Sequence, residues 1–132
     1  MEAIVRRRLH NQQLTAPSLR RPSEVVHWLG AVQAQDYAGA KWGIGLRLHP
    51  AGGAANDAAV EDAFNTGAIL RTHVLRPTWH FVAPEDIRRL LALTAPRVHK
   101  LNIPYYRKTG LDDDLARRVP QVFTGALQGG VY

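Results

Sequence analysis

The chain has 132 residues, of which 45% are hydrophobic, so it can bury one proper core and is too apolar for a disordered segment. It contains no cysteine, which excludes a disulfide framework and a thiolate metal site, and no run approaches the roughly 20 apolar residues of a membrane span. The net charge of +6 and the preference for arginine over lysine favour a partner rich in phosphate.

The same features favour a cytoplasmic protein, because no apolar secretory segment is present either. If the phosphate-rich partner is DNA, the protein would be associated with the nucleoid. The alternative explanation of the charge is compositional, since a chain rich in Ala, Gly and Arg is also typical of a GC-rich genome.

Two helices are expected first, over residues 2–14 and from Ser23 to about Val32. The first carries a basic cluster, residues 6–8, which either contacts phosphate or forms a solvated helix face. The second begins with a good capping residue, Ser23, has Glu24 in its first turn, and continues with apolar residues at helical spacing.

Two amides, Gln33 and Gln35, follow this apolar stripe, with Asp36 beside them. Residues two apart on a helix point about 200° from each other, whereas in an extended segment they share one side. The pair can therefore converge on a ligand only if the helix ends or loosens near Val32. Otherwise both are solvated amides at a helix end.

Residues 40–48 alternate between apolar and other residues, a pattern typical of a strand. Lys41 and Arg47 within this segment are expected to reach a backbone phosphate. A loop of small residues follows, and then a helix from about Ala58 to Asn65 that carries acidic residues and no basic residue.

The next pattern predicts a β-hairpin, with strands over residues 69–75 and 78–83 and Arg76 at its tip. The alternation places Trp79 and Phe81 against the core. The opposite, outer surface of the hairpin is expected to carry three polar or cationic side chains: Arg71, His73 and His80.

The two hairpin histidines have no cysteine and no carboxylate at ligand spacing, so we predict no metal site, and nothing in the sequence indicates a cofactor. Two interpretations of His80 stay open. It is either a hydrogen-bonding residue of a packed hairpin or a residue that lines a site.

The remaining residues predict a helix that opens at Pro84 and ends at Pro96, followed by a short helical connection, which is the most basic part of the chain. A last helix is expected from Leu111 toward Gln128, with acidic residues in its first turn.

Two long segments carry a resemblance to a known family: RPSEVVHWLGAVQAQDYAGAKWGIGLRL and ILRTHVLRPTWHFVAPEDIRRLLALTAPRV. From about Arg8 to Arg97 the chain resembles the winged-helix family that includes the AlkZ-type DNA glycosylases. The resemblance implies a mainly α fold with a small β-hairpin, a winged helix-turn-helix that is the first module of a tandem array. Residues 1–110 would form this module, with its wing at about 68–83, and residues 111–132 would begin a second. The resemblance also favours a helix, and not a strand, over residues 40–48.

In that family a Gln-x-Gln or Gln-x-Asp element is catalytic, and this role carries over onto Gln33 and Gln35. The implied substrate is an N7-alkylated or crosslinked purine in duplex DNA. Such a base already carries positive charge, so amide oxygens that stabilise an oxocarbenium-like transition state suffice, without the carboxylate pair of a neutral-sugar hydrolase. Asp36 would activate the water, or would instead cap or turn the chain. The residues expected to bind DNA are Lys41, Arg47, Arg71, His73, Arg76 and His80.

Two alternatives to a glycosylase stay open, and the acidic helix at 58–65 favours the one in which the winged helix binds another protein. A winged helix keeps its recognition helix just before the hairpin, but an acidic helix is poorly suited to a major groove flanked by phosphates. The alternatives are a non-catalytic winged-helix DNA-binding module with a regulatory role and a winged helix that binds another protein.

Overall fold

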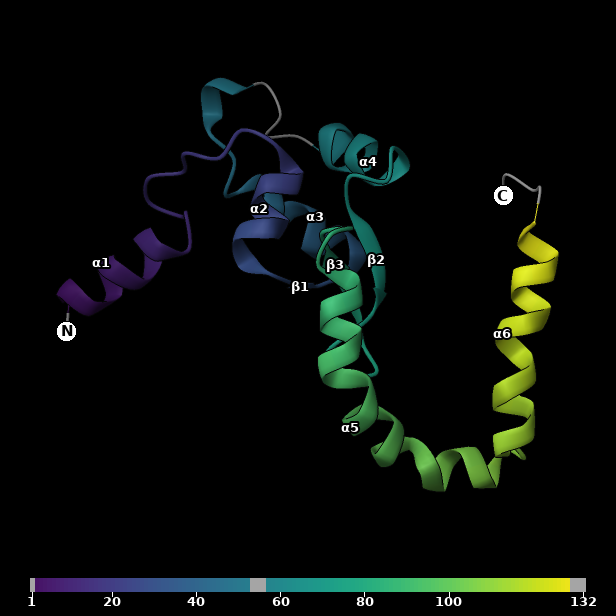
Figure 1. Cartoon of the computed structure of the whole chain (residues 1–132). Coiled ribbons are helices and arrows are strands. Elements are labelled where there is room, and N and C mark those ends of the chain that lie inside the picture. The colour runs from purple at the N-terminus through teal and green to yellow at the C-terminus, as the bar shows by residue number, and fades with distance from the viewer. Residues whose placement is uncertain (1, 53–56, 129–132) are drawn as a thin grey trace. The chain divides into compact units, whose positions relative to one another are not determined.

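The computed structural model describes residues 2–52 and 57–128, and the chain divides into two compact units, Met1–Ala95 and Pro96–Tyr132 (Figure 1). The elements in chain order are α1 (Glu2–Asn11), α2 (Pro22–Leu29), β1 (Val32–Gln33), α3 (Tyr37–Gly45), a short 3-10 turn (Pro50–Gly52), α4 (Asp57–Asn65), β2 (Leu70–His73), β3 (Trp79–Val82), α5 (Ile87–Lys108) and α6 (Asp113–Leu127). No helix within the described ranges is both long and apolar enough to cross a bilayer.

The fold is mainly α with a small β-sheet, as predicted. The hairpin of β2 and β3 gains a third, antiparallel strand, β1, so that the strand order is β1-β3-β2. Helix α4 lies directly before the hairpin in the sequence, and this element order is consistent with the predicted winged helix. The sequence pattern did not predict β1, which is only two residues long.

The core of the first unit lies where α2, α3 and α4 pack together and against the sheet. Three aromatic rings meet there, with Phe81 at a centroid distance of 5.7 Å from Tyr37 and 6.4 Å from Phe64. Phe81 is fully buried, so its predicted place against the core is confirmed. The largest fully buried side chains are Phe81, Ile44, Ile69, Val25, Val26, Val60 and Val82.

The strand predicted by alternation over residues 40–48 is wrong, and the helix implied by the resemblance is correct. Of the alternating apolar residues, Ile44 is buried on α3, and Leu48 is buried beyond the helix end, where it forms an isolated β-bridge with Leu19. Trp42, on α3, is 69% exposed, and Leu46, just beyond the helix end, is 44% exposed. The alternation was therefore that of a helix with apolar residues on more than one side.

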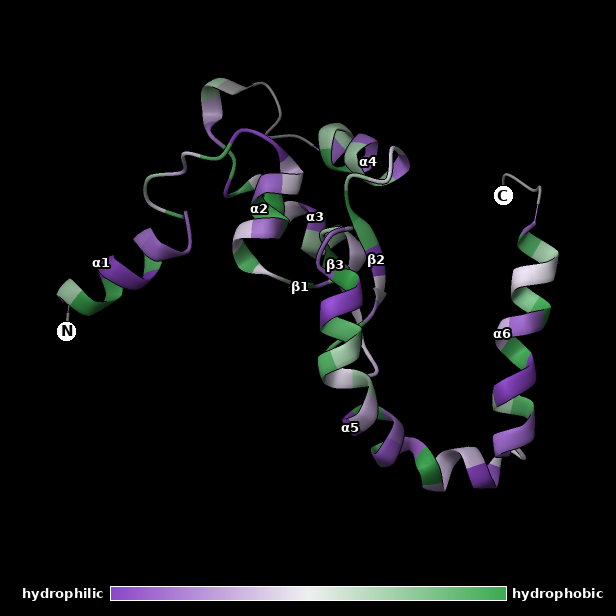
Figure 2. Cartoon of the chain, viewed as in Figure 1, coloured by the Kyte–Doolittle hydropathy of each residue, from purple (hydrophilic) through white to green (hydrophobic). Residues whose placement is uncertain are grey.

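The predicted helix end at Pro96 is also wrong, because α5 continues through Pro96 and Pro104 to Lys108. A proline inside a helix removes one backbone hydrogen bond, while the turns on either side keep theirs. The boundary between the two compact units nevertheless falls at Pro96. Along α5 and α6, hydrophilic and hydrophobic residues alternate (Figure 2), and none of the described residues in either helix is buried.

Candidate active site

The segment between α2 and α3 is extended and carries the two predicted catalytic amides. Helix α2 ends at Leu29, and Gly30 stops it with a φ of +75°, a conformation that suits glycine. Gln33 then pairs with His80 of β3, and the Ala34 N–H donates to Trp79 O at 2.8 Å. The condition for the two amides to converge, an early end of the helix, is thus met.

Gln33 and Gln35 both lie exposed on either side of the buried Ala34. Gln33 Oε1 accepts a hydrogen bond from Arg76 Nη2 at 3.4 Å, and Gln35 Oε1 accepts one from the Trp79 N–H at 3.3 Å. Both side chains line one open hollow of about 430 Å³. The other lining residues of this hollow are Val32, Asp36, Gly39, Ala40 and Gly43.

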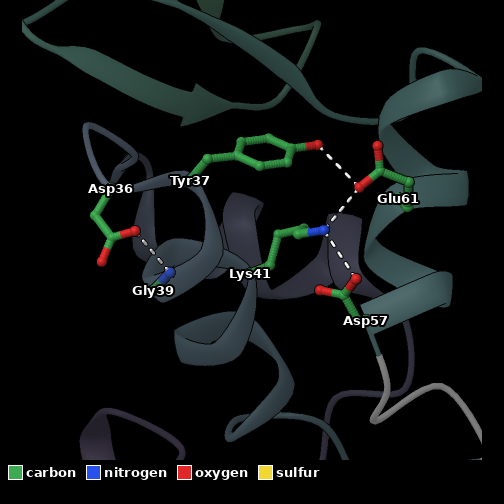
Figure 3. A network of polar contacts seen from close by, with 6 residues as sticks. All are labelled: Asp36, Tyr37, Gly39, Lys41, Asp57 and Glu61. Carbon is green, nitrogen blue, oxygen red and sulfur yellow. Dashed lines mark hydrogen bonds and ion pairs between the residues drawn. The ribbon is translucent and has the colours of Figure 1, made fainter.

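Asp36 begins α3 as its capping residue. Its Oδ1 accepts a hydrogen bond from the Gly39 N–H at 3.1 Å, which satisfies one of the free N–H groups of the helix start (Figure 3). A Cβ added at Gly39 would overlap Asp36 Oδ2, so glycine gives the carboxylate room. Of the two predicted roles of Asp36, the structure shows the cap, and activation of water stays a prediction.

The expected outer surface of the hairpin is wrong, because the strand register separates its members. Arg71 is opposite Phe81 and His73 is opposite Trp79, so these four share one side of the sheet, whereas His80 lies on the other. His80 is only 4% exposed, and its Nδ1 donates to Thr78 O at 2.8 Å. The interpretation of His80 as a hydrogen-bonding residue of a packed hairpin describes this geometry.

Arg71 points inward. Its Nε and Nη2 donate to Ala34 O at 3.2 and 3.0 Å, and its guanidinium lies 5.3 Å from the Tyr37 ring centre and 4.6 Å from that of Trp79. His73 is exposed and stacks on Trp79 at 4.1 Å between ring centres. Of the hairpin residues predicted to bind DNA, the structure therefore exposes His73 and Arg76.

The two residues predicted to contact phosphate, Lys41 on α3 and Arg47 just beyond its end, have partners within the protein. Lys41 Nζ is 2.9 Å from Asp57 Oδ2 and 2.8 Å from Glu61 Oε2, and its side chain is only 10% exposed (Figure 3). Arg47 donates to Gly43 O and, at 3.2 Å, to Gln12 Oε1. The Lys41 ammonium is thus paired with two carboxylates and little exposed, which disfavours a phosphate contact.

The Lys41 cluster joins α3 to α4 and shifts the pKa values of its members. The hydrogen bond from Lys41, followed by that from Tyr37 at 3.1 Å, lowers the pKa of Glu61. The Glu61 and Asp57 carboxylates raise the pKa of Lys41 above its usual value. Burial, and then the hydrogen bond to Glu61, raises the pKa of Tyr37. Two of the acidic residues of α4 are thus used within the fold.

Within the described part of the chain, no three His, Cys, Asp or Glu side chains are grouped so that they could hold a metal ion.

The contact at the candidate site that sequence patterns missed is the one between Arg71 and Ala34. Its only signal in the sequence was the position of Arg71 on the predicted strand, and that pattern could not show which side of the sheet faces the helices.

One of the comparisons with known proteins identifies a family. A family model described as "DNA glycosylase AlkZ-like" matches residues 26–130, which include both glutamines, the sheet and all of α6. Neither the search of curated proteins nor that of solved structures gave a match. Since the family model covers most of its length, the chain belongs to the AlkZ-like DNA glycosylase family.

Proposed function

We propose that this chain is a DNA glycosylase module that hydrolyses the N-glycosidic bond of N7-alkylated or crosslinked purines, with Gln33 and Gln35 as its catalytic residues. The observation that carries the proposal is that both amides emerge from one extended segment and line one hollow. The same proposal takes residues 1–110 as the first winged-helix module and residues 111–132 as the opening of a second.

The chemistry suits two amides. A purine alkylated at N7 leaves with the electron pair of the C1′–N9 bond and becomes neutral, so it needs no acid to protonate it. Positive charge then develops on the sugar, where carbonyl oxygens provide electrostatic stabilisation. A water molecule adds its oxygen to C1′ and loses a proton, which leaves an abasic deoxyribose.

The hydrogen bonds at the site leave capacity for this role. An amide oxygen has two lone pairs, and each Oε1 uses one: Gln33 for Arg76, and Gln35 for the Trp79 N–H. The second lone pair of each oxygen is free to face a sugar or a water. Asp36 lines the same hollow. Its Oδ1 accepts the hydrogen bond from the Gly39 N–H, and its Oδ2 would accept the proton that the water loses.

The test uses duplex DNA that contains N7-methylguanine, with abasic sites counted under single-turnover conditions. We expect the chain to form abasic sites and the Gln33→Ala/Gln35→Ala double variant to form none above background. Gln121→Ala, an exposed glutamine on α6, is the matched control and should keep the full rate. Equal counts for the chain and the double variant would contradict the enzymatic proposal.

The same experiment separates the alternatives. Binding to duplex DNA that weakens steeply with salt, without abasic sites, would indicate a non-catalytic DNA-binding module. Absence of salt-dependent binding would indicate a protein-binding module. The structure weakens the argument for that last alternative, because Asp57 and Glu61 of the acidic helix are paired with Lys41.

A further inference from the structure

The residue between the two glutamines is held through its side chain and both backbone polar groups. Ala34 is fully buried within the core cluster. Its N–H donates to Trp79 O, and its carbonyl oxygen accepts two hydrogen bonds from the guanidinium of Arg71. A residue fixed in this way also fixes the two Cα atoms beside it, from which the catalytic amides project.

The two arginine bonds replace a regular contact of the sheet. In an antiparallel ladder, Trp79 would accept from Ala34 N–H and donate back to Ala34 O. Here the Trp79 N–H donates to the Gln35 side chain instead, and Arg71 donates to Ala34 O in its place. The ladder therefore ends in hydrogen bonds of two side chains, which join Arg71 to Ala34 and Gln35 to Trp79.

Arg71 is itself oriented. Its guanidinium lies against the rings of Tyr37, at the start of α3, and of Trp79, on β3. A planar group held against two rings presents its donors in a fixed direction, and charge-assisted donors are stronger than neutral ones. Lysine has neither the plane nor the paired donors, so it cannot replace arginine here.

We propose that Arg71 is a positioning residue of this site, which holds the carbonyl of Ala34 so that Gln33 and Gln35 aim into one hollow. Its effect on catalysis rests on the proposed function. Its effect on the segment does not. The role differs from the phosphate contact that the sequence pattern predicted, because the donors of Arg71 are directed at the protein's own backbone.

The experiment compares Arg71→Met and Arg71→Lys with Arg88→Met, which removes the same charge from an exposed position on α5. We expect both Arg71 variants to lower the single-turnover rate, Arg71→Met by about 100-fold, the loss typical of a small misplacement of catalytic groups. The dissociation constant for the duplex should stay within about twofold, with an unchanged salt slope. Arg88→Met should keep the wild-type rate.

A second variant shows whether the planar group is what matters. In Arg71→Ala, guanidinium ions at low millimolar concentration should restore part of the rate, and ammonium ions at equal ionic strength should not. Unaltered melting temperature under both salts excludes general stabilisation as the cause of the rescue.

Two results would overturn the proposal: an unchanged rate in Arg71→Met, or no difference between the two ions. If the unchanged rate comes with weaker binding and a salt slope reduced by about one, Arg71 contacts a phosphate instead.

If the wild-type chain releases no base, the proposed function fails and amide hydrogen exchange of Ala34 decides the positioning role. Faster exchange in Arg71→Met, at an unchanged rate for core amides such as that of Val26, supports it, and an equal Ala34 rate overturns it.

Discussion

Helix α3 has polar groups on two sides, and the two sets differ in how fully their hydrogen-bonding capacity is used. Toward α4, the Lys41 ammonium is paired with Asp57 and Glu61 and lies 4.8 Å from the centre of the Tyr37 ring. Toward β1, Gln33 and Gln35 face an open hollow with one lone pair engaged on each amide oxygen.

This difference separates a polar cluster that stabilises the fold from one that is available to a ligand. Buried or half-buried charges persist in a fold when they are paired, and such pairs have little left to offer a substrate. Exposed amides with free lone pairs contribute little to stability, so their presence at the edge of a sheet calls for another explanation. The following changes act on one side of α3 or, in one case, at the start of the helix, where the two sides meet.

The largest expected effect is on the amide side. Removing one group that stabilises transition-state charge costs about 10²–10³-fold in rate, so Gln33→Ala and Gln35→Ala should each lose about that much. The double variant should lose less than the product of the two, because both act on one transition state. Single-turnover rates measure this, and melting temperatures within about 3 °C of wild type show that the fold is intact.

The next effect is on the ion-paired side. Lys41→Met leaves two carboxylates without their cation, so we expect a melting temperature several degrees lower at pH 7, with the glycosylase rate of the folded protein unchanged. Glu2→Gln breaks an exposed pair with Arg6 and is the control that should change little. A wild-type melting temperature in Lys41→Met would show that the cluster does not stabilise the fold.

The same cluster predicts a pH dependence with a defined sign. The pKa of Glu61 is lowered from its ordinary 4.5, so its contribution is present above that pH and is lost as the pH falls through the lower, folded value. The pKa of Lys41 is raised from its ordinary 10.5, so its contribution persists below that pH and is lost only above it. The stability difference between wild type and Lys41→Met should therefore be constant between pH 5 and 10, and shrink below pH 4.5.

A smaller effect is expected where the two sides meet, at the start of α3. Gly39→Ala gains about 1 kcal/mol of helix propensity but displaces the Asp36 cap, which costs about the same. Stability should therefore change little, while the reshaped hollow lowers the rate by about tenfold, the cost of about 1.4 kcal/mol in the barrier. Gly45→Ala, where a Cβ meets no atom within 4 Å, is the control that should keep the rate.

The smallest effect should come from Arg76, which is exposed at the hairpin tip. Arg76→Ala removes one cation from the proposed DNA-binding side and should reduce the slope of log affinity against log salt by about one. Titrations of one duplex at several salt concentrations measure it. An unchanged slope would mean that Arg76 only orients Gln33, through the hydrogen bond at 3.4 Å.

Most of the fold could be predicted from local patterns, because capping residues, apolar spacing and turn residues act over a few positions. The hairpin and the capped start of α6 are examples, with Asp112 accepting a bond from the Leu115 N–H at 2.8 Å. Strand β1 escaped prediction because two residues are too few for an alternation. Helix α5 passes Pro96 because the remaining backbone bonds of the helix outweigh the missing one.

The site was predictable in part. Gln33 and Gln35 were identified from the family resemblance, and the requirement for an extended segment followed from their spacing. The contact of Arg71 with Ala34 could not be predicted, because pairing register decides which strand residues share a side, and a slip of one residue reverses it. The partners of Lys41 lie 16 and 20 residues away on another helix, beyond the reach of any local pattern.

Strand β1 occupies the edge of the sheet, and the spacing of the two glutamines along this segment decides the face on which each amide lies. In a pleated chain, odd and even positions alternate between opposite faces. One residue inserted beside Ala34 would therefore turn one amide toward the helices, whereas Ala34→Gly would keep both on the open face. The number of residues in this segment therefore decides whether the two amides share a face.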